Sequence, residues 1–346
     1  MKRFRIACLL LAAAAMAAPP PVAAAEQPAP PPAAAVEKPA QPQADAPTEA
    51  ASAEPSAGPA AGELPLLDET RVLIHDGFEW LVRGVDRLFG DQPFERGGRV
   101  AGRIRLGTLW RQDDGFDWLT RFAIRARLPN LEARGTYFFL GRDNEREVVS
   151  DRPDGLTRRE ALLPEAREDQ SFFAGLGRDL RRGFSYRVGL RGGLKPFAQA
   201  RYRQQWDLGT RSQVEFRETV FWTLDDRFGS TTALNFDHLL DPTLALRWQN
   251  AGTISQESDG LEWSSSIGLY YSPGFQRQLS LEALINGATE RDTDVSEYGV
   301  RLRWEQPIYK DWLLLETIVG YFWPRRGSEI ERDRAFALGF SLQLLF

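Results

Sequence analysis

The chain has 346 residues and a formal net charge of −5, so it lacks the overall positive charge with which a protein binds nucleic acid or another polyanion. Apolar residues make up 42% of it and the mean hydropathy is −0.38. These values do not separate a soluble protein from a membrane protein whose strands alternate between polar and apolar faces. The single cysteine, Cys8, lies near the N-terminus, so the rest of the chain offers neither a disulfide nor a cysteine metal site.

Residues 1–25 have the pattern of a secretory signal peptide. A basic start, Met1–Arg5, is followed by a short apolar run, Ile6–Ala18, and by three small residues, Ala23–Ala25. The apolar run is too short to serve as a membrane anchor. Residues 26–62 are almost entirely Ala, Pro, Glu and Gln with no apolar period, which predicts a disordered, extended tether.

Residues 63–94 are predicted to form an amphipathic helix. Asp68 is expected to cap its start and Gly90 to end it. His75 is expected to be an ordinary surface histidine, because no second His or Cys is spaced to bind a metal with it. The sequence leaves three arrangements open for the apolar face. It packs on the chain itself or on a second copy of the chain, it plugs the mouth of the following domain, or it lies on a membrane surface. Apolar residues at helical spacing carry this prediction: Ile74, Phe78, Leu81, Val82, Val85, Leu88 and Phe89.

Residues 95–346 are predicted to be all-β, with about fourteen strands and twelve as the alternative count. The even number returns the chain to the side from which it entered, and tight turns alternate with longer, charged connections. The longest connection, 142–170, is either a solvated loop or a segment folded into the interior. The strands are expected at about 99–111, 117–128, 131–141, 170–180, 183–192, 197–206, 211–222, 229–238, 242–253, 261–272, 277–287, 295–305, 311–324 and 334–346.

The last strand alternates strictly between an apolar face, from Phe336 to Phe346, and a face of small and polar residues. A final strand of this kind, with Phe346 at its end, resembles the closing strand of Gram-negative outer-membrane β-barrels of the porin-like class. The resemblance implies a transmembrane antiparallel β-barrel in the cell outer membrane, with the N-terminal segment in the periplasm. It also implies outer-membrane lipid and the barrel-assembly machinery as partners. A periplasmic protein or peptidoglycan is left open as a further partner of the N-terminal segment.

Parity within each strand separates a lipid-facing side from an interior side. One residue fits badly: Glu218 shares its parity with the apolar Phe216 and Val220. A lipid-facing carboxylate is costly, so a bulge or shifted register is expected there. Tryptophans near strand ends are expected to form an interfacial girdle: Trp110, Trp118, Trp206, Trp222, Trp304, Trp312 and Trp323.

The interior side is charged. Glu132 is among its expected acids. Glu262 and Glu282 have the parity to face each other on adjoining strands, but lumen-facing carboxylates serve more often as electrostatic partners than as catalysts. The residues predicted to line a pore are Arg103, Arg105, Arg121, Arg125, Arg127, Arg134, Arg201, Arg203, Glu262, Glu282, Arg301 and Arg303. A wet interior with this arginine excess would favour anions, whereas a narrow one would lock the charges into cross-strand pairs that hold the barrel shut.

No enzyme, cofactor or metal site is predicted. His238 is the one histidine of the strand region, it shares the lipid-facing parity, and the His-x-Ser pattern of outer-membrane phospholipase is absent, since Leu240 takes the serine's place. The expected function is a channel for small solutes, with anions favoured. The alternatives are a closed structural or assembly barrel whose helix docks an envelope partner and, third, a lipid-modifying enzyme.

Overall fold

The computed structural model describes residues 65–132, 136–153, 156, 170–258, 260–289, 294–325 and 331–346, without the side chains of residues 132 and 145–147. The predicted signal peptide, the predicted linker and Arg134 lie outside the described residues. Among those residues, no helix is both long and apolar enough to cross a membrane.

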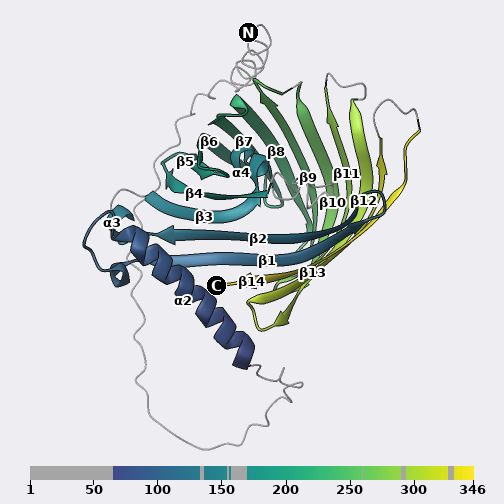
Figure 1. The fold of residues 1–346 in the computed structure, drawn as a ribbon. Helices are drawn as coiled ribbons and strands as arrows, with labels where there is room; N and C mark the ends of the chain where they lie inside the picture. The colour runs from purple at the N-terminus through teal and green to yellow at the C-terminus, as the bar shows by residue number, and fades with distance from the viewer. Residues whose placement is uncertain are drawn as a thin grey trace, which may run out of the picture. The chain divides into compact units, whose positions relative to one another are not determined.

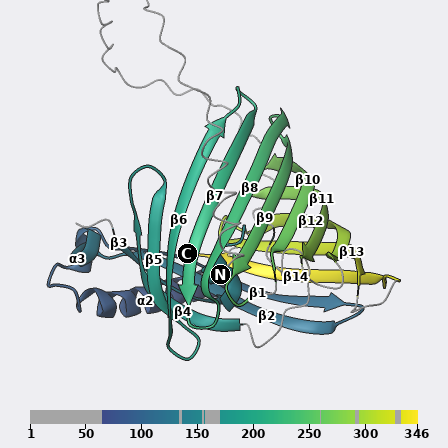
Figure 2. The same ribbon diagram turned by 90° about the horizontal axis from the view of Figure 1, so that it is seen from above.

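Fourteen antiparallel strands close into a barrel, seen from two directions in Figures 1 and 2. Each strand pairs with its neighbours in sequence, and the first pairs with the last. The all-β prediction and the count of fourteen are therefore confirmed. The strands are β1 (Arg99–Arg111), β2 (Gly115–Arg127), β3 (Thr136–Asn144), β4 (Gln170–Asp179), β5 (Phe184–Arg191), β6 (Lys195–Asp207), β7 (Ser212–Thr223), β8 (Arg227–Asp241), β9 (Leu244–Ser255), β10 (Glu262–Gly274), β11 (Arg277–Ala288), β12 (Val295–Tyr309), β13 (Leu313–Pro324) and β14 (Ala335–Leu345).

The third strand begins later than predicted. A one-turn helix, α3 (Pro129–Glu132), occupies the residues expected to start it, so Glu132 does not belong to the barrel wall. Proline suits the first position of a helix, where its missing N–H costs nothing. The next residue, Asn130, is held in place because its Nδ2 donates to Asp86 Oδ2 over 2.8 Å.

Alternation along the strands divides the wall as predicted. In β12, Val300 and Leu302 face outward and are 43% and 44% exposed, whereas Arg301 between them faces inward and is 1% exposed. Near the strand ends, Trp110 and Trp118 are exposed on the outer face, as an interfacial girdle requires. Trp312 does not belong to such a girdle: it is buried and packs edge-on against Tyr309, so that part of the prediction is wrong.

Glu218 faces outward without any bulge, so the expected irregularity is wrong. The register of β7 with β6 and β8 is unbroken around Glu218. Two hydroxyls from β8 donate to the carboxylate: Ser230 Oγ to Oε1, and Thr232 Oγ1 to Oε2 over 2.6 Å. The neighbouring strand therefore satisfies the carboxylate on the outer face, and the ladder does not need to slip.

Helix α2 (Pro65–Asp86) lies against the outside of the barrel, beside β1 (Figure 1). Phe78 stacks on Phe346 with ring centroids 5.4 Å apart and lies 6.1 Å from Phe122, and both partners have outward parity. Val82, only 1% exposed, packs with Ala126 on the same face of β2. The helix packs on its own barrel, one of the arrangements that the sequence left open, and does not plug the opening.

Polar contacts fasten the first two turns of α2. The prediction that Asp68 caps the helix is wrong, because Asp68 lies inside the first turn and bonds to the barrel. It accepts hydrogen bonds from Lys310 Nζ at 2.6 Å and Tyr309 Oη at 2.9 Å, beside the turn between β12 and β13. The hydrogen bond from Lys310 holds the pKa of the Asp68 carboxyl below its usual range. In the second turn of the helix, Arg71 Nε donates to the carbonyl of Leu345 over 3.2 Å, so α2 bridges the seam where β14 meets β1.

Removing the Phe78 ring is predicted to loosen α2 without opening the barrel. Phe78→Ala loses a stacked aromatic contact and part of its buried area, about 1–3 kcal/mol. Tryptic cleavage at Arg83 should then run roughly 5- to 150-fold faster. Val72→Ala, at an exposed site on the same helix, is the control and should leave the rate unchanged; equal rates for the two variants would contradict this account of the packing.

Candidate functional site

A short helix after β3 lies inside the barrel. Helix α4 (Glu145–Ser150) opens the long connection predicted to be either solvated or folded inward, and it lies near β6, β7 and β8. Val149, 1% exposed, packs with Phe197 and Phe221, whose parity on β6 and β7 is inward. Gln199 Nε2 donates to the Val149 carbonyl over 3.1 Å. The described part of this connection therefore folds into the interior.

Asp151, directly after α4, fastens the segment to β6 and β7. Its carboxylate accepts from Arg201 and from Thr219 Oγ1, the latter at 3.3 Å, and lies 3.6 Å from Arg217. The Asp151 backbone has a positive φ of 55°, a conformation that aspartate tolerates better than most residues. The next residue, Arg152, pairs with Glu262 of β10 at 3.7 Å. Charge pairs thus hold this constriction segment, residues 145–153, across the lumen.

Beside the constriction segment the lumen keeps a polar hollow of about 450 Å³. Pro153 of the segment forms one edge of it, and the remaining wall comes from inward positions of most of the strands. Seven arginines and five carboxylates line the hollow: Arg103, Arg105, Arg121, Arg203, Arg217, Arg247 and Arg303, with Asp143, Glu215, Asp237, Glu305 and Glu316. The charge of the lining is therefore biased towards the positive sign.

Cross-strand pairs order the wall of the hollow. Arg203 lies 2.6 Å from Glu215, and Arg247 Nε donates to Asp237 over 2.5 Å. Arg105 donates to Gln343, from Nε over 3.1 Å and from the terminal nitrogen over 2.6 Å. These two hydrogen bonds fix the orientation of the Arg105 guanidinium.

The residues predicted to line a pore fall into three groups. Arg103, Arg105, Arg121, Arg203 and Arg303 border the hollow. Arg125 and Arg127 are exposed at the end of β2, where Arg125 pairs with Asp179 at 2.5 Å. The third group, consisting of Arg201, Glu262, Glu282 and Arg301, is engaged in pairs around the hollow.

Glu262 and Glu282 do not face each other, although their parity would have allowed it. In the register of β10 with β11, Glu262 lies opposite Ala288, and Glu282 lies opposite Gly268. Glu282 pairs with Arg301, its direct neighbour on β12, at 2.6 Å, and both side chains are fully buried. Ser280 Oγ donates to the same carboxylate over 2.9 Å. Parity alone could place both acids inside but could not fix how far one strand slides along the next.

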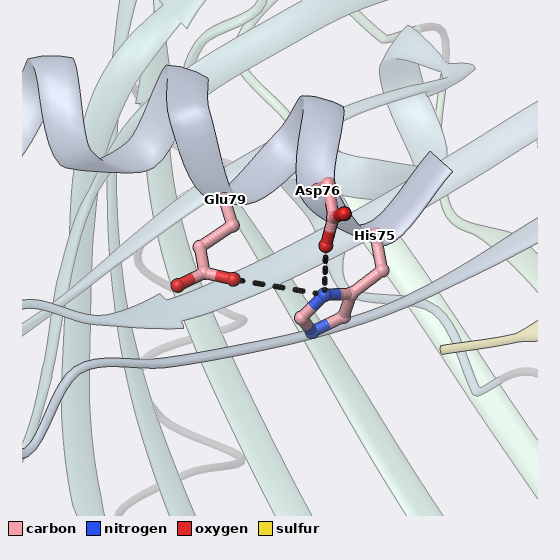
Figure 3. A group of neighbouring side chains, drawn as sticks. All are labelled: His75, Asp76 and Glu79. Carbon is pink, nitrogen blue, oxygen red and sulfur yellow. Dashed lines mark hydrogen bonds and ion pairs between the residues drawn. The ribbon is translucent and has the colours of Figure 1, made fainter. Parts of the chain in front are cut away.

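One group in the described part of the chain has the composition of a metal site: His75, Asp76 and Glu79 on α2 (Figure 3). His75 Nδ1 lies 3.5 Å from Asp76 Oδ1 and 3.7 Å from Glu79 Oε2. Glu79 also forms an ion pair with Arg83, at 2.7 Å. The imidazole also lies edge-on to Phe346, which fixes its position in the packing of the helix. The contacts of this group with Arg83 and Phe346 therefore serve to pack α2 on the barrel.

Sequence reasoning missed a serine beside His238. Ser212 Oγ lies 2.8 Å from His238 Nδ1, on the outer face, at the pairing of β7 with β8. A nucleophilic serine needs a base that a third group orients, and a donor for the oxyanion. His238 stacks on Phe236 with ring centroids 6.4 Å apart. A phenyl ring cannot orient the histidine by a hydrogen bond, and it cannot donate one to an oxyanion. The pair has the geometry of a cross-strand hydrogen bond.

The closed ring of fourteen strands, its apolar outer face and its charged interior define an outer-membrane β-barrel of the porin-like class. The search against protein-family models and the search of curated proteins both found no match.

Solved structures with a similar fold are outer-membrane proteins. They include a loop-deletion mutant of OmpT, an outer membrane protein of Vibrio cholerae, at 12% identity, covering 72% of this chain and 99% of that one with a TM-score of 0.41. An anion-selective porin from Comamonas acidovorans matches at 10% identity, 72% and 99% coverage and a TM-score of 0.43. The outer membrane channel DcaP of Acinetobacter baumannii matches at 9% identity, 72% and 97% coverage and a TM-score of 0.44.

Releasing the constriction segment is predicted to widen the lumen. Asp151→Asn removes one partner of a largely buried ion pair, a loss of about 3–5 kcal/mol in such settings. Any conductance measured in planar bilayers should rise and become noisier as the segment leaves the wall. Asp225→Asn, which breaks the 2.9 Å pair with Arg191 at a more exposed site, is the matched control. A conductance that is the same in both variants and in the unaltered protein would argue against a constricting role.

Proposed function

We propose that the barrel passes small solutes across the outer membrane and favours anions. The observation that carries this proposal is the hollow of about 450 Å³, in which seven arginines outnumber five carboxylates beside the constriction segment. A small hollow suits small solutes, and the charge of its lining suits negatively charged ones.

The physical basis is the field inside a confined, weakly screened space. Charges that line a narrow passage interact with a permeating ion more strongly than charges on an open surface. Arg103 is exposed to the hollow, and no ion pair engages it within the described residues. Arg105 lies on the same face of β1 and also borders the hollow, oriented by its hydrogen bonds to Gln343. Arg103 is therefore the position from which an anion would gain most, and Arg105 adds to the positive charge beside it.

A second candidate function is a closed structural barrel, and specific contacts favour it. Two arginine–carboxylate pairs, Arg301 with Glu282 and Arg111 with Glu297, are each 2.6 Å apart and almost completely buried. Inward-facing apolar residues such as Ile318 and Phe322 fill another part of the interior. The first ion pair joins the adjacent strands β11 and β12, and the second joins β1 to β12, three strands away in the ring. Buried contacts of this kind lock the wall and would narrow any passage.

Reversing the charge at Arg103 and Arg105 is predicted to reverse ion preference. Arg103→Glu combined with Arg105→Glu should move the reversal potential in a KCl gradient from the anion-selective towards the cation-selective side. The control is Arg211→Glu combined with Arg277→Glu, since both arginines lie away from the hollow. The control should keep the original selectivity.

Two outcomes would count against the proposal. Equal reversal potentials for the altered lining and for the control would show that these arginines do not select. A folded protein without measurable conductance, in both the unaltered and the Asp151→Asn forms, would favour the closed barrel.

A further inference from the structure

Helix α2 carries a second apolar surface that the barrel does not cover. Leu66, Leu73, Trp80 and Leu88, the last just beyond the helix, are 77%, 72%, 78% and 80% exposed. Their spacing of seven or eight residues places them along one side of the helix at ~3.6 residues per turn. We call these four residues the outer stripe of α2.

The outer stripe continues the face that packs on the barrel. Going round the helix from Phe78 and Val82 at the wall, the apolar Ile74 and Leu81 lead to the stripe with no charge between. Two positions beside the stripe are glycine, Gly77 and Gly84, and nothing lies within 4 Å of where their Cβ atoms would be. About half of the helix circumference is therefore apolar except for Arg71, which bonds to the carbonyl of Leu345, and the barrel covers only part of that half.

Charged residues occupy the remaining side of the helix. Asp68 and Asp86, on that side, bond to residues of the turns at the end of the barrel, Lys310 and Asn130. Phe78, on the apolar side, instead reaches Phe122, five residues up β2 from Arg127 and roughly 16 Å along the strand. The apolar side of α2 therefore faces the middle of the wall, and the charged side faces its end. The residues that make up the charged side with these two aspartates include Glu69, Asp76, Glu79, Arg83 and Arg87.

We propose that the outer stripe of α2 is a lipid-binding surface, immersed in the membrane leaflet at the end of the barrel where both α2 and Phe346 lie. The stripe is continuous with a lipid-facing surface, because α2 lies on the outward face of the wall, and in a barrel that face is in contact with acyl chains. A helix with an apolar half, a charged half and a tryptophan at the boundary has the composition of one that lies in the interface plane.

The arrangement explains two features together. The charged side can stay in the headgroup region while the stripe enters the acyl chains, so no charge has to enter the hydrocarbon. The helix also lies across the seam of β14 and β1, where Phe78 covers Phe346. The same helix therefore binds lipid with one part of its apolar surface and covers the last residue of the barrel with the other.

Spin labelling at single cysteines tests the proposal directly. In a Cys8→Ser background, Leu73→Cys and Trp80→Cys place a nitroxide on the stripe, and Asp76→Cys is the matched control on the charged side. Leu302→Cys reports the lipid-facing wall, and Asp225→Cys reports an exposed turn. The proteins are reconstituted in phosphatidylethanolamine–phosphatidylglycerol vesicles, with heat-modifiable gel mobility confirming a folded barrel. Collision of the label with oxygen, which concentrates in lipid, is compared with collision with a water-soluble nickel chelate.

The expected result is an oxygen-to-nickel ratio at residues 73 and 80 that is several-fold higher than at residue 76 and close to that at residue 302. Ratios at 73 and 80 that match residue 225 would overturn the proposal, because the stripe would then lie in water. Low collision with both reagents would also overturn it, in favour of a protein that covers the stripe. The lipid-binding proposal does not depend on conductance. Either proposal, lipid binding by α2 or transport through the lumen, can therefore fail while the other stands.

Discussion

Everything in this molecule depends on closure of the backbone hydrogen-bond ring. In a membrane, an unpaired backbone N–H or C=O costs several kcal/mol, so a sheet can span lipid only when its first and last strands pair. Here β1 and β14 provide that pairing, and Gly102 and Phe346 exchange both backbone hydrogen bonds at its end. A side chain on Gly102 would collide with the Phe346 ring, so glycine allows the final aromatic residue to lie flat across the seam. Helix α2 then covers the same ring from outside.

Once the ring is closed, alternation decides what each side chain meets. Outward positions become the apolar surface, and inward positions must share a small volume that holds many arginines. The barrel handles this charge in two ways. Some arginines are buried in pairs such as Arg301 with Glu282, while others border a hollow that the constriction segment narrows from one side. Asp151 links the two arrangements, because it neutralises wall arginines and holds the segment in place.

The sequence predicts the features that repeat locally. Period-two alternation located fourteen strands and their outward faces, since each strand carries that signal within about ten residues. Features that depend on contacts between distant residues were not predictable. Nothing around Asp151 indicates that it pairs with Arg201, fifty residues later. The satisfied carboxylate of Glu218 depends on Ser230 and Thr232 in the next strand, whose register is set by the whole hairpin. Parity likewise placed Glu262 and Glu282 inside but could not assign their partners, and α3 was missed because one helical turn has no periodicity to detect.

Cross-linking the first strand to the last tests the closed ring most directly. Because Gly102 and Phe346 form a hydrogen-bonded pair, Arg105 and Gln343 form a non-hydrogen-bonded pair, in which facing residues lie closest. The account predicts that Arg105→Cys combined with Gln343→Cys forms a disulfide in the membrane-inserted protein, seen as a linked peptide by mass spectrometry. The offset pair, Arg105→Cys with Ala337→Cys, should not form one. Absence of the first link in a folded protein, or preference for the offset link, would contradict a ring closed in this register.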